Sequence, residues 1–307
     1  MEKIGLIDLD NIDSKNKFPN LALMKISAFH KAKGNLVEWY QPLLSNAEYD
    51  IVYVSKIFSW TPNYLYPINA KKIIYGGIGY DLNNKLDKDI EHTYPDYSLY
   101  SIKNQAYGFL TRGCPRQCKF CNVGVQQGTK SLKVANLQEF WKGQREIILL
   151  DPNILASKNW KELFIQLYES KAFIEFSQGL DIRLMTKEKA EYLNKLKLKM
   201  VHFAWDNYEM QTYKKLKYYR EYLNFKNRQL GVYVLVNFNT TLEQDLERIY
   251  KLRNVGYTPY VMRYKSPDTK NKSLVKGNIY NKLARWVNRK HFFNKFETFE
   301  EYLKEAH

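Results

Sequence analysis

Three cysteines, the only ones in the 307-residue chain, lie within one short segment. Cys114, Cys118 and Cys121 follow the spacing CxxxCxxC. Thiolates are soft ligands that suit zinc, copper(I) and iron–sulfur clusters. An odd, clustered set of cysteines does not make a disulfide framework, so the segment predicts a metal centre in a reducing compartment.

The number of ligands separates two kinds of metal site. A structural zinc ion takes four ligands, and no His or Cys follows the segment closely, since His92 lies well upstream. A four-iron cubane can be held by three thiolates, which leaves one iron open to a substrate or cofactor. The sequence favours the cluster, and a zinc site made of three cysteines and one histidine stays open as the alternative.

Alternating strand and helix patterns must position this segment. Apolar runs typical of strands occur at 107–110, 147–150, 174–176, 201–204, 232–236 and 260–263. Amphipathic segments typical of helices separate them at 160–169, 186–196, 208–223 and 242–252. About six β/α units predict an α/β fold in which residues 101–307 form a partial (β/α)6 TIM-like barrel with C-terminal helices. The cysteine segment directly follows the first of these strands.

The first hundred residues predict a smaller unit. Strand-like runs at 4–9, 36–40, 51–54 and 73–75 surround one helical pattern at 21–33. This alternation predicts a Rossmann-like α/β unit over residues 1–100 with a parallel sheet of its own. The boundary near residue 100 rests on the change of pattern rather than on a flexible joint.

CxxxCxxC with an aromatic residue just before the last cysteine resembles the signature of the radical S-adenosylmethionine (SAM) superfamily. The resemblance implies a [4Fe–4S] cluster on Cys114, Cys118 and Cys121, whose open iron chelates the amino and carboxylate groups of SAM. It implies reductive cleavage to a 5′-deoxyadenosyl radical, which takes hydrogen from a nucleic-acid base or a small metabolite. It also implies an electron donor such as flavodoxin or ferredoxin.

The same resemblance assigns cofactor contacts at the carboxyl ends of the strands, where barrels bind their ligands. Phe120 is expected near the adenine. Asp151 stands where the family often has a Gly-Gly-Glu-like stretch that grips the methionine amine, and it is expected to substitute for it. Asn237 follows a later strand at the same edge. A turn is the structural alternative for Asp151.

Ser177 to Arg183 forms a second group of polar residues after a strand. It is similar to the family segment that contacts the ribose and the methionine carboxylate. Gln178 and Asp181 are expected to hold ribose hydroxyls, and Arg183 to pair with the carboxylate in bidentate fashion. A surface ion pair is the structural alternative for Arg183. No residue is predicted for the catalytic step itself.

The N-terminal unit resembles a truncated cobalamin-binding domain, with a glycine-rich strand end at 75–79. The family's lower-ligand pattern DxHxxG aligns with Asp8 to Asp13, where Asp10 replaces the His and Asp13 the Gly. Loss of cobalamin is therefore favoured, and the acidic loop is expected to be a solvated turn. A cobalamin-dependent radical SAM methyltransferase stays as the alternative.

The cysteine count excludes related chemistries. Methylthiotransferases need three more cysteines for a second cluster, and peptide-maturing enzymes with auxiliary clusters need more again. RNA methylases that pass through a methyl-cysteine need at least one spare cysteine. All three cysteines of this chain are committed to one cluster, so these classes are disfavoured.

The charge of the chain bears on its partners. Lys and Arg number 48 against 32 Asp and Glu, a net charge of +16. Such a charge favours polyanions, and the many Tyr and Phe residues suit stacking on bases. A Lys-, Asn- and Tyr-rich composition also arises in AT-biased genomes without selection for binding. A non-catalytic nucleic-acid-binding protein with a three-cysteine zinc site is thus the alternative from another class. No stretch approaches the length of a membrane span, so a cytoplasmic protein without a membrane partner is expected.

Overall fold

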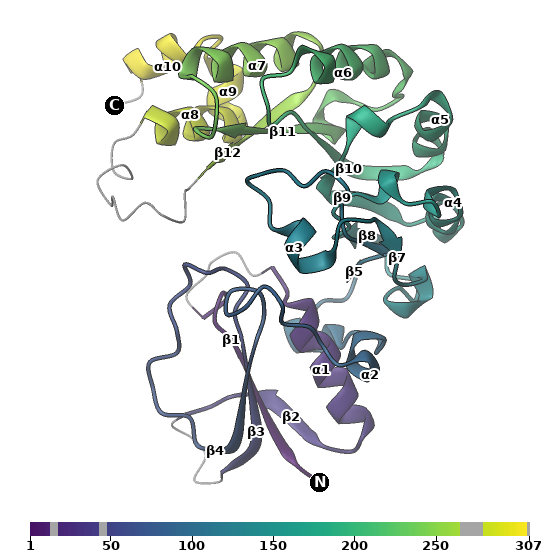
Figure 1. Ribbon diagram of the computed structural model, residues 1–307, viewed down its shortest axis with the longest axis vertical. Helices are drawn as coiled ribbons and strands as arrows, with labels where there is room; N and C mark the ends of the chain where they lie inside the picture. Colours follow the sequence, from purple (N-terminus) through teal and green to yellow (C-terminus); the bar gives the residue numbers. More distant parts are fainter. Residues whose placement is uncertain (13–17, 43–47, 265–278, 306–307) are drawn as a thin grey trace.

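The computed structural model describes residues 1–12, 18–42, 48–264 and 279–305. It contains two parallel sheets and a two-stranded antiparallel sheet. This confirms the predicted α/β class (Figure 1). No helix of the described residues is both long and apolar enough to cross a membrane.

The first sheet has four parallel strands in the order β2-β1-β3-β4. Its strands are β1 (Lys3–Asp8), β2 (Leu36–Trp39), β3 (Tyr49–Ser55) and β4 (Ala70–Gly76). Helix α1 (Leu21–Ala32) joins β1 to β2 and begins where the Asn20 side chain accepts a hydrogen bond from the Leu23 amide. Leu23 and Ile26 of this helix pack on Ile4 and Leu6 of β1, so apolar burial holds the helix against the sheet.

The second sheet has six parallel strands that follow one another in chain order. These strands are β5 (Gln105–Gly108), β8 (Glu146–Leu149), β9 (Phe173–Leu180), β10 (Lys197–Ala204), β11 (Leu230–Val236) and β12 (Thr258–Arg263). Successive strands from β8 onward are joined by α4 (Trp160–Ser170), α5 (Lys187–Lys195), α6 (Met210–Tyr222) and α7 (Leu242–Asn254), which lie on one side of the sheet (Figure 1). The described strands form an open sheet with β5 and β12 at its edges, and no closed barrel is present.

Shorter elements complete the chain. They are α2 (Lys88–Glu91), α3 (Val123–Gln127), β6 (Thr111–Arg112), β7 (Leu132–Lys133) and the 3₁₀ turns η1 (Tyr97–Tyr100), η2 (Leu137–Glu139), η3 (Ile154–Ala156), η4 (Ile182–Leu184) and η5 (Asn227–Gln229). The chain closes with α8 (Ile279–Asn288), α9 (Lys290–Lys295) and α10 (Phe299–Glu305), as predicted for its end. Trp286 of α8 is fully buried against the rings of Phe293 and Phe299, which packs the three helices together.

Among the strand boundaries that differ from the prediction, two bear on the cysteine segment and its neighbours. The first strand of the second sheet ends at Gly108 rather than residue 110, because the amides of Leu110 and Thr111 bond to the Asp151 carboxylate instead of to a neighbouring strand. Strand β9 continues to Leu180 rather than ending at 176, so Gln178 lies inside the strand and not in the loop after it. A periodicity of apolar residues cannot reveal either change, since both depend on partners distant in sequence.

Side chains of the N-terminal unit, which contains the first sheet, are in direct contact with side chains around the second sheet. Met24 of α1 belongs to the apolar core of the second sheet, and the ring of Phe18 meets that of Tyr107 on β5 at 5.3 Å. The carboxylate of Glu91 accepts from Lys25 of α1 and from Arg112 of β6, each at 3.0 Å. The division into domains at residue 100 stays a prediction.

Candidate functional site

The cysteine segment forms a loop between β6 and α3. Strands β6 and β7 pair antiparallel and close the base of the loop. Gly113 has φ +87°, and a Cβ there would lie 2.2 Å from the Lys130 carbonyl oxygen, so this closure requires glycine. The Cys114 amide then donates to the Gly128 carbonyl at 3.0 Å. Backbone geometry thus places the first cysteine at a defined point.

The three thiols form no disulfide and interact electrostatically with one another. Cys114 and Cys118 are half-buried and Cys121 is exposed. Desolvation raises the pKa of the Cys118 thiol, Arg183 lowers it, and Cys121 and Cys114 raise it further. The pKa of Cys121 is also raised, chiefly by desolvation and in part by Cys114. The Asn153 side-chain amide donates to the Cys114 sulfur at 3.4 Å.

The donor set fits an iron–sulfur cluster in kind and in number. Three thiols on one short loop are the soft ligands that such clusters use. Among the described residues, no three His, Cys, Asp or Glu side chains are already gathered around a common metal position. Binding a cluster therefore requires the three thiols to turn toward a common point.

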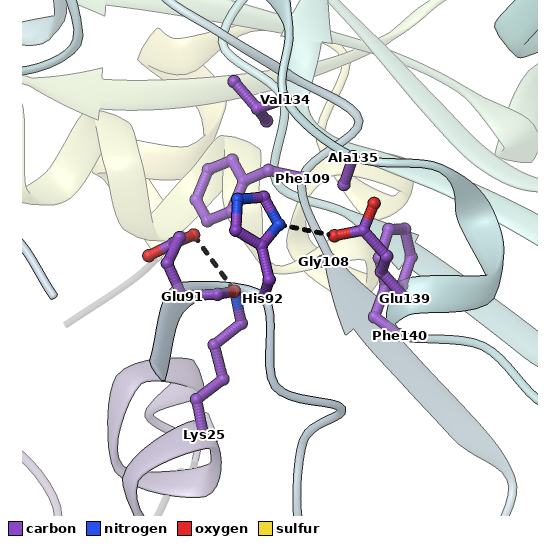
Figure 2. A pocket seen from close by; sticks show the side chains of 9 residues that line it. All are labelled: Lys25, Glu91, His92, Gly108, Phe109, Val134, Ala135, Glu139 and Phe140. Atoms are coloured by element: carbon purple, nitrogen blue, oxygen red, sulfur yellow. Dashed lines mark hydrogen bonds and ion pairs between the residues drawn. The ribbon is translucent and has the colours of Figure 1, made fainter. Parts of the chain in front are cut away.

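The histidine of the zinc alternative is engaged elsewhere. Nδ1 of His92 is 2.8 Å from Oε2 of Glu139. Figure 2 shows this pair in a small pocket whose lining includes Lys25, Glu91 and Phe109 but no cysteine. The contact of His92 with a carboxylate gives no support to a zinc site of three cysteines and one histidine.

Asp151 lies beneath the cysteine loop and holds the strand that leads into it. Its carboxylate accepts from the Leu110 amide at 3.1 Å, from the Thr111 amide at 2.5 Å and from the Thr111 hydroxyl at 2.7 Å. Burial raises the pKa of Asp151 to about 6, against the opposing effect of these hydrogen bonds. All of these bonds are made to the protein itself, and the expected contact with a methionine amine stays a prediction.

Asp181 joins the cysteine loop to the end of β9. It accepts from Nε of Arg183 at 2.8 Å and from Nε of Arg116 at 2.5 Å. Burial raises the pKa of Asp181, but the hydrogen bonds and charges of the two guanidinium groups outweigh it and hold the pKa below its usual range. Arg116 lies between the first two cysteines, and sequence reasoning missed it, although a cation inside a metal-binding loop was a usable signal.

The remaining predicted residues have distinct placements. Phe120 meets the ring of Phe238, which follows β11, edge-on at 5.5 Å between centroids. Gln178 is exposed on β9, and Asn237 is exposed just after β11 with φ +62°. The structure therefore brings Phe120 to the end of β11, while the ribose role of Gln178 and the cofactor role of Asn237 stay predictions.

A carboxyl group outside the set of predicted site residues interacts electrostatically with two of the thiols. Asp206 follows β10, and burial raises its pKa to about 6, while the charges of Arg248 and Arg183 lower it. Asp206 in turn raises the pKa of Cys118 and Cys121. The site thus contains a further ionisable group, which follows the end of β10.

Behind Asp206, a fully buried ion pair joins the ends of β10 and β11. Arg248 and Asp245 have side chains that are 0% exposed, and the two charges are 2.5 Å apart. The Arg248 guanidinium also donates to the Trp205 carbonyl at 2.5 Å and the Leu235 carbonyl at 2.7 Å. The pair therefore fixes the backbone that carries Asp206 and Asn237. In the sequence, Asp245 and Arg248 are simply two charged residues three positions apart on an amphipathic helix, and this spacing does not indicate that both are buried.

The acidic loop of the N-terminal unit is not the solvated turn that was expected. Asp8 is buried and accepts from the Tyr100 hydroxyl at 2.5 Å and from the Asn11 amide at 2.7 Å. Asp10 accepts from the Ile57 amide at 2.6 Å. Both carboxylates bind other parts of the protein, which a local reading of the sequence could not reveal. Asp13 lies outside the described residues.

A scan against protein-family models finds no matching family, and a search of curated proteins finds no match.

Proposed function

We propose that this chain is a radical SAM enzyme that binds one [4Fe–4S] cluster through Cys114, Cys118 and Cys121. The observation that carries the proposal is the CxxxCxxC loop itself, which follows the first strand of a six-stranded parallel sheet and contacts the ends of later strands. Arg116 links the loop to Asp181 at the end of β9, and Phe120 links it to the end of β11. Ligands of parallel α/β sheets bind at this edge.

The proposed architecture is a partial (β/α)6 TIM-like barrel preceded by a Rossmann-like unit. Six parallel strands in chain order, with helices on one side, support the first part. Four parallel strands with α1 support the second. The cysteine loop contacts the ends of β9 and β11, and we infer that a cofactor larger than a metal ion would bind at these strand ends.

The residues have separable roles in this proposal. When bound, the cluster would supply the single electron for reductive cleavage of SAM. The bonds of Arg183 to Asp181 use its Nε and Nη2 groups, and we assign its Nη1 group to the SAM carboxylate. The group formed by Arg116, Arg183 and Asp181 has a net charge of +1, which an anionic ligand would balance. Phe120 offers its ring to the adenine.

Anaerobic reconstitution with iron and sulfide, reduction and addition of SAM test the proposal. We expect 5′-deoxyadenosine, detected by chromatography, and its loss in Cys118→Ala. Leu132→Ala, an exposed apolar residue at the base of the same loop, should retain the activity and is the control. Bound zinc without iron or sulfide would contradict the proposal and support the zinc alternative. Uptake of a corrin by the same preparation would favour the cobalamin-dependent methyltransferase.

A further inference from the structure

Two aromatic rings project from the loop that follows β3. Phe58 and Trp60 stack with their centroids 4.8 Å apart and their planes 14° from parallel. Phe58 is 46% exposed and Trp60 is 70% exposed. Ordered apolar side chains at the surface often mark a site of interaction, because their exposure to water costs free energy.

Partly buried hydrogen bonds hold this exposed segment in place. One carboxylate oxygen of Asp10 accepts from the Ile57 amide at 2.6 Å, and the other accepts from the Thr61 hydroxyl at 2.5 Å. The Thr61 amide donates to the Phe58 carbonyl at 3.1 Å, which closes a turn around Trp60. The aromatic pair is thus presented on a turn with a defined backbone.

The start of the segment is fixed as firmly. The Lys56 amide donates to the Gly76 carbonyl at 3.0 Å, and the Lys56 carbonyl accepts from the Gly79 amide at 2.8 Å. At Gly77 an added Cβ would lie 2.3 Å from the Lys56 carbonyl oxygen, so the glycine-rich end of β4 packs directly under the segment. The glycines noted in the sequence therefore support this turn.

Positive charge gathers on the cysteine loop and its flanks. Figure 1 shows the carboxyl ends of β1, β3 and β4 directed toward the part of the second unit that contains α3. The cysteine loop and its flanks, residues 111–130, contain four cations and no acidic residue. Residues 56–69, which hold the aromatic pair, contain one cation and no acidic residue. Lys119 and Lys130 are exposed, whereas Arg112 and Arg116 pair with Glu91 and Asp181. The exposed Lys119 and Lys130 are complementary to a polyanion, while Asp8 and Asp10 at the end of β1 are engaged in hydrogen bonds with the protein itself.

We propose that Phe58 and Trp60, with the cations of residues 111–130, form a docking surface for single-stranded nucleic acid. A base would extend the existing ring stack, and Lys119 and Lys130 would contact phosphates. Planar rings that are already stacked favour a flat partner over an aliphatic one, and the bases of a single strand are free to stack. The net charge of +16 favours a nucleic acid over a second copy of this chain. The inference is independent of the cluster chemistry.

Fluorescence anisotropy of labelled oligonucleotides tests this surface. The purified 307-residue protein, without SAM, would be titrated into a 15-nucleotide single-stranded RNA, the matching single-stranded DNA and the duplex. We expect the single strands to bind better than the duplex, and Trp60→Ala or Phe58→Ala to weaken binding about tenfold each. Trp60→Phe should restore most of the affinity. Lys119→Ala should reduce the salt dependence of binding.

The control is Leu65→Ala, which removes an aliphatic side chain that is 84% exposed on the same loop. It should bind as the unchanged protein does. Thermal unfolding of each variant shows whether the loop still folds. Equal loss in Leu65→Ala and Trp60→Ala, preference for the duplex, or absence of binding at about 100 μM protein would overturn the inference. None of these outcomes bears on 5′-deoxyadenosine formation, so the two proposals fail separately.

Discussion

At the scale of single residues, the site depends on carboxylates whose environments differ. Asp181 is held ionised by Arg116 and Arg183, which lower its pKa. Within the part of the chain that the structure describes, no cation is in hydrogen-bond contact with Asp151, and burial raises its pKa to about 6. Burial raises the pKa of Asp206 to about 6 as well, even though the charges of Arg248 and Arg183 lower it. Two carboxyl groups near the cysteine loop therefore change charge near neutral pH, while the third does not.

Asp151 gives a prediction about stability and pH. The pKa of Asp151 is about 6 in the folded protein and 3.8 as an ordinary carboxyl group, so the folded state binds the proton more tightly. The contribution of Asp151 to stability therefore falls as the pH rises from about 4 to about 6. The difference corresponds to on the order of 3 kcal/mol. Asp151→Asn should lower stability at every pH, because an amide cannot accept all three hydrogen bonds, but its deficit should shrink by about this amount between pH 4 and pH 7. Urea unfolding of both proteins at the two pH values measures it, and a constant deficit would refute the assignment.

At the scale of elements, the short β6–β7 hairpin and helix α7 do the positioning. The hairpin sets where the cysteine loop leaves and rejoins the second unit. Helix α7 places Asp245 and Arg248 one turn apart, so that their charges meet beneath the ends of β10 and β11. Each element makes hydrogen bonds to backbone carbonyl groups of other segments. For each element, a disruptive substitution can be compared with a matched control substitution.

Gly113→Ala should open the base of the cysteine loop. The new methyl group would lie 2.2 Å from the Lys130 carbonyl oxygen, and the backbone at φ +87° is strained for any residue with a Cβ. Iron bound after reconstitution should fall several-fold. Gly128→Ala has nearly the same strain at φ +94° but meets no atom within 4 Å, so it separates crowding from strain. Similar iron content in both variants would argue against the closure described here.

Arg248→Met should be among the most destabilising substitutions in the second unit. It leaves the Asp245 carboxylate buried without its cation, which typically costs about 3–5 kcal/mol. Lys251→Met on the same helix breaks the pair with Glu247, whose carboxyl side chain is 40% exposed, and should cost under about 1 kcal/mol. The free energy of unfolding in urea compares the two. The double variant Asp245→Leu with Arg248→Met should recover much of the loss, and failure to do so would show that the carbonyl contacts matter more than the charge pair.

At the scale of the whole molecule, Glu91 lies where the two units meet. Its Oε1 atom accepts from Lys25 of the first unit (Figure 2). The same atom accepts from Arg112 beside the cysteine loop. The same region contains the ring contact of Phe18 with Tyr107. The first unit is therefore connected to the strand that leads into the proposed cluster-binding loop.

Glu91→Gln should weaken this connection without unfolding either unit. The variant keeps a hydrogen-bonding side chain but loses the charge that Lys25 and Arg112 share, at a cost on the order of 1 kcal/mol, since the three groups are partly exposed. Differential scanning calorimetry should show a lower and broader transition. Glu188→Gln, which breaks the exposed pair with Lys161 within the second unit, should leave the transition unchanged. An effect of Glu188→Gln as large as that of Glu91→Gln would contradict a specific role at the junction.

The sequence by itself determined the α/β class, the strands of both sheets to within a few residues, and the three thiols with their order on one loop. These follow from local patterns, because apolar periodicity reports the secondary structure and ligand spacing reports the donor set. Only the tertiary structure decided where the polar residues point. Asp151 was expected at a ligand and is found under the loop, and Asp8 and Asp10 were expected in solvent and are found in hydrogen bonds. A charged side chain takes its role from the donors that surround it, and Arg116, Thr111 and Ile57 are brought to these carboxylates by folding rather than by nearness in the chain.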